Sequence, residues 1–237
     1  KAGHRFPRSR GGAAGTEGRS EVGAGRGSRV RRKRRAHRVV RREGSGAMNQ
    51  WEVLEILERE EAVRRGHFLL TSGLHSDTYV QCAMVLQHPH IAESLADEIA
   101  KAFQDEDMDL VISPALGGII IGYMVAMALR KRMLFAERVE GGLILRRGQN
   151  ISPGEKALIV EDVITTGGSV KELMKVVEAA GAKIIGVAAL IERGKGRDLG
   201  VRKKVLLELE AEAWEEGECP LCKQGLELET PGSRGLA

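Results

Sequence analysis

Cysteine is scarce in this sequence, and long apolar runs are missing. Three cysteines in 237 residues are too few for a disulfide framework, which predicts a protein of the reducing cytoplasm. No run of about 18 apolar residues and no apolar signal segment occurs, so we expect neither a membrane-spanning helix nor secretion. Cys219 and Cys222 have zinc-knuckle spacing, but a structural zinc ion needs four ligands and there is no second such pair. We therefore expect two reduced thiols, with zinc shared across a dimer as the alternative.

The first 47 residues are nearly free of large apolar side chains. They contain fifteen Lys and Arg against three acidic residues, a net charge of +12. Such a segment cannot bury enough surface to offset its ordering entropy, so we predict a disordered basic leader over 1–47, one that is not part of the native protein. The basic run 31–35 could bind nucleic acid non-specifically. Residues 48–237 have 22 basic and 30 acidic residues, a net charge of −8, which favours neither nucleic acid nor a membrane as partner.

From residue 48 onward the sequence alternates between helical patterns and short apolar strands. The strands 110–112, 157–160 and 184–191 are continuously apolar, and helices are expected between them. This rhythm predicts an α/β fold with a parallel central sheet and helices on both faces. We also expect helices over 49–65 and 89–103, strands at 78–81 and 133–136, a loop or hairpin over 137–150, a loop over 161–168, and a half-exposed late strand around 205–209.

The segment 157–169 carries the strongest chemical signal. A buried strand ends in Glu161 and Asp162, and a loop of small residues then runs directly into a helix. Backbone N–H groups and hydroxyls at a helix N-terminus form a phosphate site, and glycines allow a close approach of the backbone. The spacing is not that of a Walker loop. It is not a Rossmann fingerprint either, because two carboxylates would repel a pyrophosphate unless a positive or hydroxylic group lay between.

This thirteen-residue order resembles the signature of type I phosphoribosyltransferases. The resemblance implies that the acids hold the ribose hydroxyls of phosphoribosyl pyrophosphate and that the loop binds its 5-phosphate. An earlier turn resembles the pyrophosphate-binding turn of that family. The implied donor-binding residues are Glu161, Asp162, Val163, Ile164, Thr165, Thr166, Gly167, Gly168 and Ser169 in the main motif, and Ala115, Leu116, Gly117 and Gly118 in the turn.

Three further segments resemble orotate phosphoribosyltransferases. Residues 66–79 are similar to the hood segment of those enzymes, 190–194 to the strand end that keeps an arginine for the orotate carboxylate, and the tail from Cys219 to that of one prokaryotic branch. The resemblance implies a hood at about 66–82, a core at about 105–195, orotate binding by Thr165 and Arg193, a homodimer, and Mg²⁺ as cofactor without direct side-chain ligation. A guanidinium can bind a carboxylate through two hydrogen bonds.

One region departs from the family pattern. Many orotate enzymes have a long catalytic loop with lysines and a histidine, whereas the stretch 137–143 is shorter and has neither. Arg138 is its only cation, and with Glu161 and Asp162 it completes the set of candidate catalytic residues. Arg146 and Arg147 follow the loop, and a solvated hairpin fits them as well as a substrate role. Two alternatives to the orotate enzyme stay open: a purine or xanthine phosphoribosyltransferase, and a regulator that binds the donor without turnover.

Overall fold

The computed structural model describes residues 47–194, 196 and 198–231. The leader predicted over 1–47 therefore lies, apart from Ala47, outside the described residues. Helix α1 (Gln50–Arg59) begins with a capping box, in which the Asn49 side chain accepts hydrogen bonds from the backbone N–H groups of Trp51 and Glu52.

The helix expected over 49–65 is shorter than predicted. Glu61 adopts a left-handed conformation with φ of 59°, which ends the helical turn. Residues after it turn back as strand β1 (Val63–Leu69), which pairs antiparallel with β2 (His75–Val80). The range predicted as one helix therefore contains helix α1 and the first residues of strand β1.

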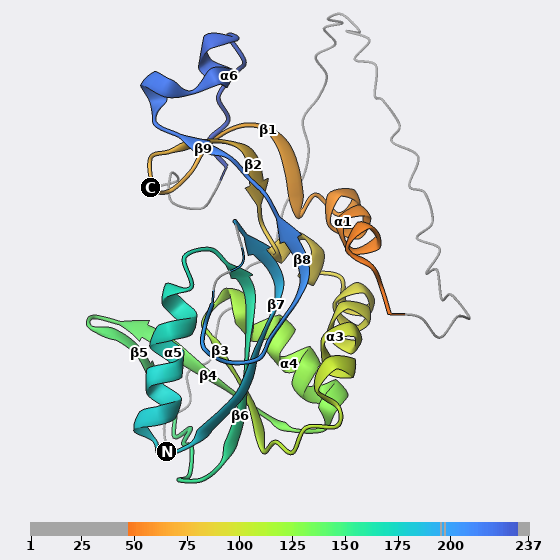
Figure 1. The fold of residues 1–237 in the computed structure, drawn as a ribbon, viewed down its shortest axis with the longest axis vertical. Coiled ribbons are helices and arrows are strands. Elements are labelled where there is room, and N and C mark those ends of the chain that lie inside the picture. Colours follow the sequence, from red (N-terminus) through yellow and green to blue (C-terminus); the bar gives the residue numbers. More distant parts are fainter. Residues whose placement is uncertain (1–46, 195, 197, 232–237) are drawn as a thin grey trace, which may run out of the picture. The chain divides into compact units, whose positions relative to one another are not determined.

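The core sheet runs in the order β5-β4-β3-β6-β7-β8 (Figure 1). Neighbouring strands are parallel except for β4 and β5, which form an antiparallel hairpin at one edge. The expected parallel sheet with helices on both faces is confirmed, with this edge hairpin as an addition. The strands are β3 (Leu110–Pro114), β4 (Arg132–Val139), β5 (Gly142–Leu145), β6 (Lys156–Ile164), β7 (Lys183–Arg193) and β8 (Lys203–Leu209).

Both faces of the core sheet are buried, as the continuously apolar strands predict. Val111 and Leu158 belong to a cluster with side chains of α3 (Pro89–Phe103) and α4 (Gly117–Leu129). Ile112 and Ile159, which point to the other face, pack with side chains of α5 (Gly168–Ala179). Figure 1 shows α3 and α4 on one side of the sheet and α5 on the other. Successive residues of one strand therefore serve opposite layers of the core.

A second, small sheet consists of β1, β2 and the two-residue strand β9 (Ala213–Trp214). Short helix α2 (Ala83–Leu86) leads from β2 toward α3, while a 3₁₀ turn (Glu216–Glu218) and helix α6 (Pro220–Lys223) follow β9. The chain then returns along β1, where the Leu69 N–H donates to the Glu229 carbonyl at 2.8 Å. This sheet thus combines the two ends of the described chain.

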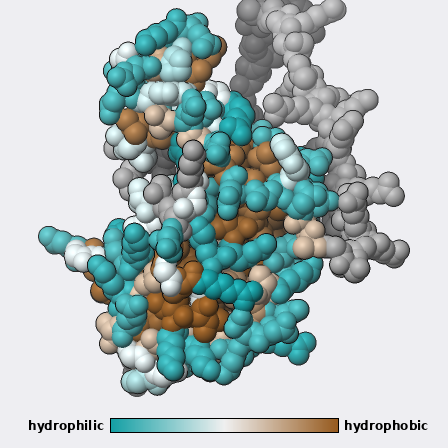
Figure 2. Space-filling view, viewed as in Figure 1, coloured by the Kyte–Doolittle hydropathy of each residue, from teal (hydrophilic) through white to brown (hydrophobic). Residues whose placement is uncertain are grey.

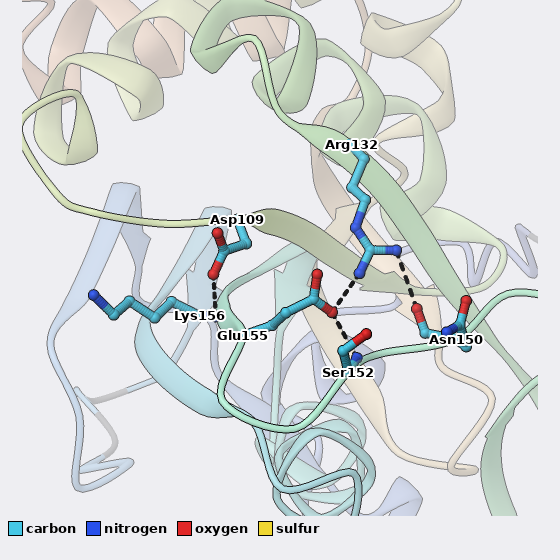
Figure 3. A network of polar contacts seen from close by, with 6 residues as sticks. All are labelled: Asp109, Arg132, Asn150, Ser152, Glu155 and Lys156. Atoms are coloured by element: carbon cyan, nitrogen blue, oxygen red, sulfur yellow. Dashed lines mark hydrogen bonds and ion pairs between the residues drawn. The ribbon is translucent and has the colours of Figure 1, made fainter.

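The amino ends of the core strands are tied by polar contacts (Figure 3). Arg132 donates to the Glu155 carboxylate at 2.5 Å and to the Asn150 carbonyl at 3.0 Å, and the Lys156 N–H donates to Asp109 at 2.8 Å. These contacts hold the loop before β6 against β3 and β4, at the edge of the sheet away from the carboxyl ends of those strands.

Hydrophilic residues predominate on the face drawn in Figure 2, with hydrophobic residues in smaller groups between them. Among the described residues, every helix is too short or too polar to cross a bilayer.

Candidate functional site

The order of the core strands defines where a site can form. From β3 the chain passes through α4 to β4 on one side, and from β6 it passes through α5 to β7 on the other. The strand order therefore reverses between β3 and β6, and ligands of open α/β sheets bind beside the carboxyl ends of strands at such a switch point. The two motifs singled out in the sequence, 114–118 and 161–169, are the segments at these two carboxyl ends.

The phosphate loop has the geometry expected of an anion site. Gly167 is the N-cap of α5 and has φ of 76°, a conformation that favours glycine. The Gly168 N–H donates to the Thr166 hydroxyl at 3.3 Å, which turns the loop into the first turn of the helix. A pocket here is lined by Glu161 and by Val163, Ile164, Thr165, Thr166, Gly167, Gly168, Ser169 and Val170.

Glu161 and Asp162 lie inside strand β6 rather than in the loop expected over 161–168. Glu161 is 6% exposed, and one of its carboxylate oxygens accepts a hydrogen bond from the Asp162 N–H at 3.1 Å. Burial raises the pKa of Glu161 to about 9, and the hydrogen bond with the Asp162 side chain and its charge act in the same direction. Near neutral pH the pair therefore carries one fewer negative charge than the sequence suggests.

The pyrophosphate-type turn touches the carboxylate pair directly. A Cβ atom placed on Gly117 would lie 2.5 Å from one Asp162 carboxylate oxygen and 2.7 Å from the other. Any larger residue at position 117 would therefore require the Asp162 side chain to move. The peptide bond between Ala115 and Leu116 is cis, and the Leu116 side chain is exposed. The structure thus brings together the two segments that the sequence analysis treats separately.

Arg138, on β4, reaches the phosphate loop. Its guanidinium donates to the Glu172 carboxylate at 2.8 Å and to the Ser169 hydroxyl at 3.4 Å, and its charge acts on Glu161 by lowering the pKa of that carboxyl. Arg147 and Arg146 instead form ion pairs with Glu137, at 2.7 Å and 3.6 Å. The three arginines are thereby separated, and Arg138 is the one placed beside the loop.

Arg193 ends β7 and faces the small sheet. Its guanidinium donates to the Ser76 hydroxyl at 2.7 Å and to the Thr78 carbonyl at 3.4 Å. Burial lowers the pKa of Arg193, and the nearby Asp77 charge opposes that shift. The hydroxyl of Ser76 in turn donates to the Glu212 carbonyl at 2.6 Å. The contact between Arg193 and Ser76 is not predicted from the sequence, because β2 and β7 lie more than a hundred residues apart in the chain.

A group of four possible metal ligands is also not predicted from the sequence. His67, His75, Cys219 and Cys222 place their ligand atoms within 4.8 Å of one another. The Cys219–Cys222 spacing was a usable signal, but the expectation of two thiols without a second pair did not consider histidines from β1 and β2 as the other ligands.

Comparison with known proteins agrees with this geometry. Residues 81–220 match the phosphoribosyl transferase domain family. The chain is 48% identical over 190 residues to the orotate phosphoribosyltransferase of Caldanaerobacter subterraneus subsp. tengcongensis, covering 80% of this chain and all of that protein. It is 47% identical over 185 residues to that of Thermotoga petrophila, covering 78% and 99% of the two chains.

Solved structures give the same fold. The orotate phosphoribosyltransferase of Aeropyrum pernix is similar with a TM-score of 0.57 and 25% identity, covering 66% of this chain and 93% of that one. The adenine phosphoribosyltransferase of Thermoanaerobacter pseudethanolicus, at 20% identity and a TM-score of 0.51, shares the fold and covers 56% and 88%. The chain belongs to the phosphoribosyl transferase domain family and, within it, to the orotate phosphoribosyltransferases.

Proposed function

We propose that this chain transfers the 5-phosphoribosyl group from phosphoribosyl pyrophosphate to orotate, giving orotidine 5-phosphate and pyrophosphate in pyrimidine biosynthesis. The observation that carries the proposal is the meeting of the 161–169 motif with the turn 115–118 at one switch point, in a chain about 48% identical to named orotate enzymes. The site would bind the two phosphate ends of the donor on either side of the carboxylate pair.

The donor is held by backbone and carboxylates. Loop 165–169 would bind the 5-phosphate through N–H groups at the N-terminus of α5, where the helix dipole favours an anion. Glu161 and Asp162 would hold the ribose hydroxyls. Val163 and Ile164, which lie between these acids and the loop, would contact the donor through their backbone. Ala115, Leu116, Gly117 and Gly118 would bind the pyrophosphate.

Orotate would bind between Thr165 of the phosphate loop and Arg193. The carboxylate of orotate calls for a cation, and Arg193 is half-buried and already oriented by Ser76. A guanidinium oriented in this way loses little freedom when it donates hydrogen bonds to a carboxylate. The three cysteines, none of them in a disulfide, support a cytoplasmic location for the reaction.

The chemistry requires positioning and charge stabilisation rather than a protein nucleophile. As N1 of orotate attacks C1 of the donor, positive charge grows on the ribose and negative charge on the leaving pyrophosphate. The Asp162 and Glu161 carboxyl groups lie where they would face the first, and Arg138 lies where it would face an anion. Mg²⁺, when bound with the donor, would neutralise pyrophosphate charge. Substrate oxygens would hold the ion without direct side-chain ligation, while the carboxyl groups of Glu161 and Asp162 would hold the ribose hydroxyls.

We also propose a homodimer. Helix α4 exposes Ile120, Tyr123 and Met127, which are 46%, 61% and 50% exposed and spaced along one face of the helix. A second copy of the chain would cover this apolar face. Light scattering at micromolar concentration should give the mass of a dimer, and a monomeric mass would contradict the proposal.

The test of the reaction is a pyrophosphate-release assay with the donor, Mg²⁺ and one base at a time. Orotate should give release, while hypoxanthine, xanthine and adenine should not. Turnover with a purine base alone would assign the chain to the purine or xanthine enzymes, and donor binding without any turnover would identify a regulator. Asp162→Asn should keep donor binding and lose most of kcat, because its charge matters most as the ribose becomes positive.

A further inference from the structure

We propose that His67, His75, Cys219 and Cys222 bind one Zn²⁺ ion that joins the small sheet to the C-terminal segment. The two histidines lie on β1 and β2, Cys219 is the N-cap of α6, and Cys222 lies in α6. Two imidazoles and two thiolates are a ligand set that zinc takes up in structural sites. The proposal does not depend on the transfer reaction, since none of the four residues belongs to the donor or orotate site.

Four of the distances between the ligand atoms fit a tetrahedral site. Bond lengths of about 2.3 Å to sulfur and 2.0–2.1 Å to nitrogen imply edges of about 3.3 Å between two nitrogens and 3.6 Å between nitrogen and sulfur. His67 Nε2 lies 2.9 Å from His75 Nδ1, 3.4 Å from Cys219 Sγ and 3.6 Å from Cys222 Sγ. Cys222 Sγ lies 3.2 Å from His75 Nδ1. Each of these four distances is within about 0.4 Å of the tetrahedral value, and all the ligand atoms lie within 4.8 Å of one another, so an ion could enter with side-chain shifts.

The ring of His67 is oriented for metal binding. Its Nδ1 lies 3.0 Å from the Leu226 carbonyl, which can only accept, so Nδ1 carries the proton and donates it. In the neutral ring Nε2 then has a free lone pair, and this lone pair faces His75 and the two sulfurs. A carbonyl that fixes the tautomer from the opposite side of the ring is the usual support of a zinc-bound histidine.

The site is closed. His67 and His75 are each 3% exposed, Cys219 is fully buried and Cys222 is partly buried. Four protein ligands leave no open position for water, which distinguishes a structural zinc from a catalytic one. Without an ion, two histidines and two thiols would be packed against one another in the interior of this part of the chain.

The small sheet has a physical need for such a cross-link. Its third strand has two residues, and the outer part of β1 and β2, from Phe68 to Ser76, contributes to neither hydrophobic cluster of the described residues. Small units of this kind are usually held by disulfides or a metal. The cysteines and histidines are about 150 residues apart in sequence, so the ion would close a long loop.

The experiment is elemental analysis of the untagged full chain, expressed with zinc in the medium and dialysed against metal-free buffer. Wild type should hold about one zinc ion per chain, and Cys222→Ser and His75→Ala should each reduce the content at least tenfold. Cys82→Ser and His90→Ala are the matched controls, since Cys82 is the cysteine outside the group and His90 is an exposed histidine. Both should keep the wild-type content.

Replacement of the ion by Co²⁺ gives a second measurement that needs no variant to fold. Wild type should show a near-ultraviolet thiolate charge-transfer band and the intense visible absorption of tetrahedral Co²⁺. Zinc-free wild type with three titratable thiols and no such Co²⁺ spectrum would overturn the proposal. So would a zinc content that the Cys222 and His75 variants leave unchanged.

Discussion

Exchange of Glu161 for glutamine should change the dependence of stability on pH. In the folded chain the pKa of Glu161 is raised to about 9, chiefly because the side chain is buried, whereas the ordinary value for glutamate is 4.5. Between these two values the folded state keeps a proton that the unfolded state has released. The contribution of Glu161 to the unfolding free energy should therefore be largest below pH 4.5 and be lost as the pH rises toward 9.

The size of the effect follows from the proton linkage. One proton difference corresponds to about 1.4 kcal/mol per pH unit, so Glu161 alone should remove on the order of 4 kcal/mol of stability between pH 5 and pH 8. The side chain is 6% exposed, so solvent screens the shift little. Glu161→Gln has the shape of the neutral acid and does not titrate. The variant should match the wild type near pH 5 and be the more stable of the two at pH 8.

The assay is urea denaturation at several pH values and constant ionic strength, without donor or Mg²⁺. Glu55→Gln removes a negative charge from the exposed side of α1 and should follow the wild type at every pH. Asp162→Asn should flatten the wild-type dependence only in part, because burial is the first cause of the shift and the Asp162 contributions come after it. A constant difference between wild type and Glu161→Gln across this range would refute the reasoning.

Three further changes test other parts of the site. Arg193→Ala should lower kcat/KM for orotate, measured by initial rates, by a factor that corresponds to about 2–5 kcal/mol, because it removes one partner of the proposed charge pair. Arg59→Ala, on the surface of α1, is the control and should have no effect on kcat/KM. Gly117→Ala should cost about 1–3 kcal/mol in urea denaturation and most of kcat, since the new methyl group would meet the Asp162 carboxylate; wild-type turnover would contradict this. Deletion of 1–47 should leave melting temperature and turnover unchanged, while RNA retention at low salt falls; a large loss of either property would show that the segment belongs to the working protein.

The core of the fold could be read from local patterns. Helix α3 begins at Pro89 and ends at Phe103, as predicted, because proline fits the first helical turn and the apolar positions keep one period. The buried strands could also be predicted, because both of their faces are covered and their residues are therefore continuously apolar. Errors occurred where the pattern is ambiguous. The strand β6 continues through two acids to Ile164, because its end faces a site rather than solvent.

Long-range contacts could not be read in this way. Ser76 meets Arg193 across 117 positions, and His67 meets Cys219 across 152. Neither pair has a local spacing that identifies the partner. Sequence patterns indicate which residues could bind a ligand or a metal ion, whereas the fold determines which of them share a site.

The structure also answers the electrostatic objection raised by the order of the motif. Two acids directly before a phosphate loop should repel the donor, yet Glu161 is buried with a pKa of about 9 and is neutral near pH 7. One carboxylate charge, on Asp162, then remains at the end of β6, where the Gly117 backbone approaches it from the first turn of α4. Arg138 lies within reach of Ser169 at the start of α5. In the proposed complex, the ribose hydroxyls separate that single charge from both phosphate ends of the donor, so the same carboxylate can stabilise positive charge on the ribose without opposing phosphate binding.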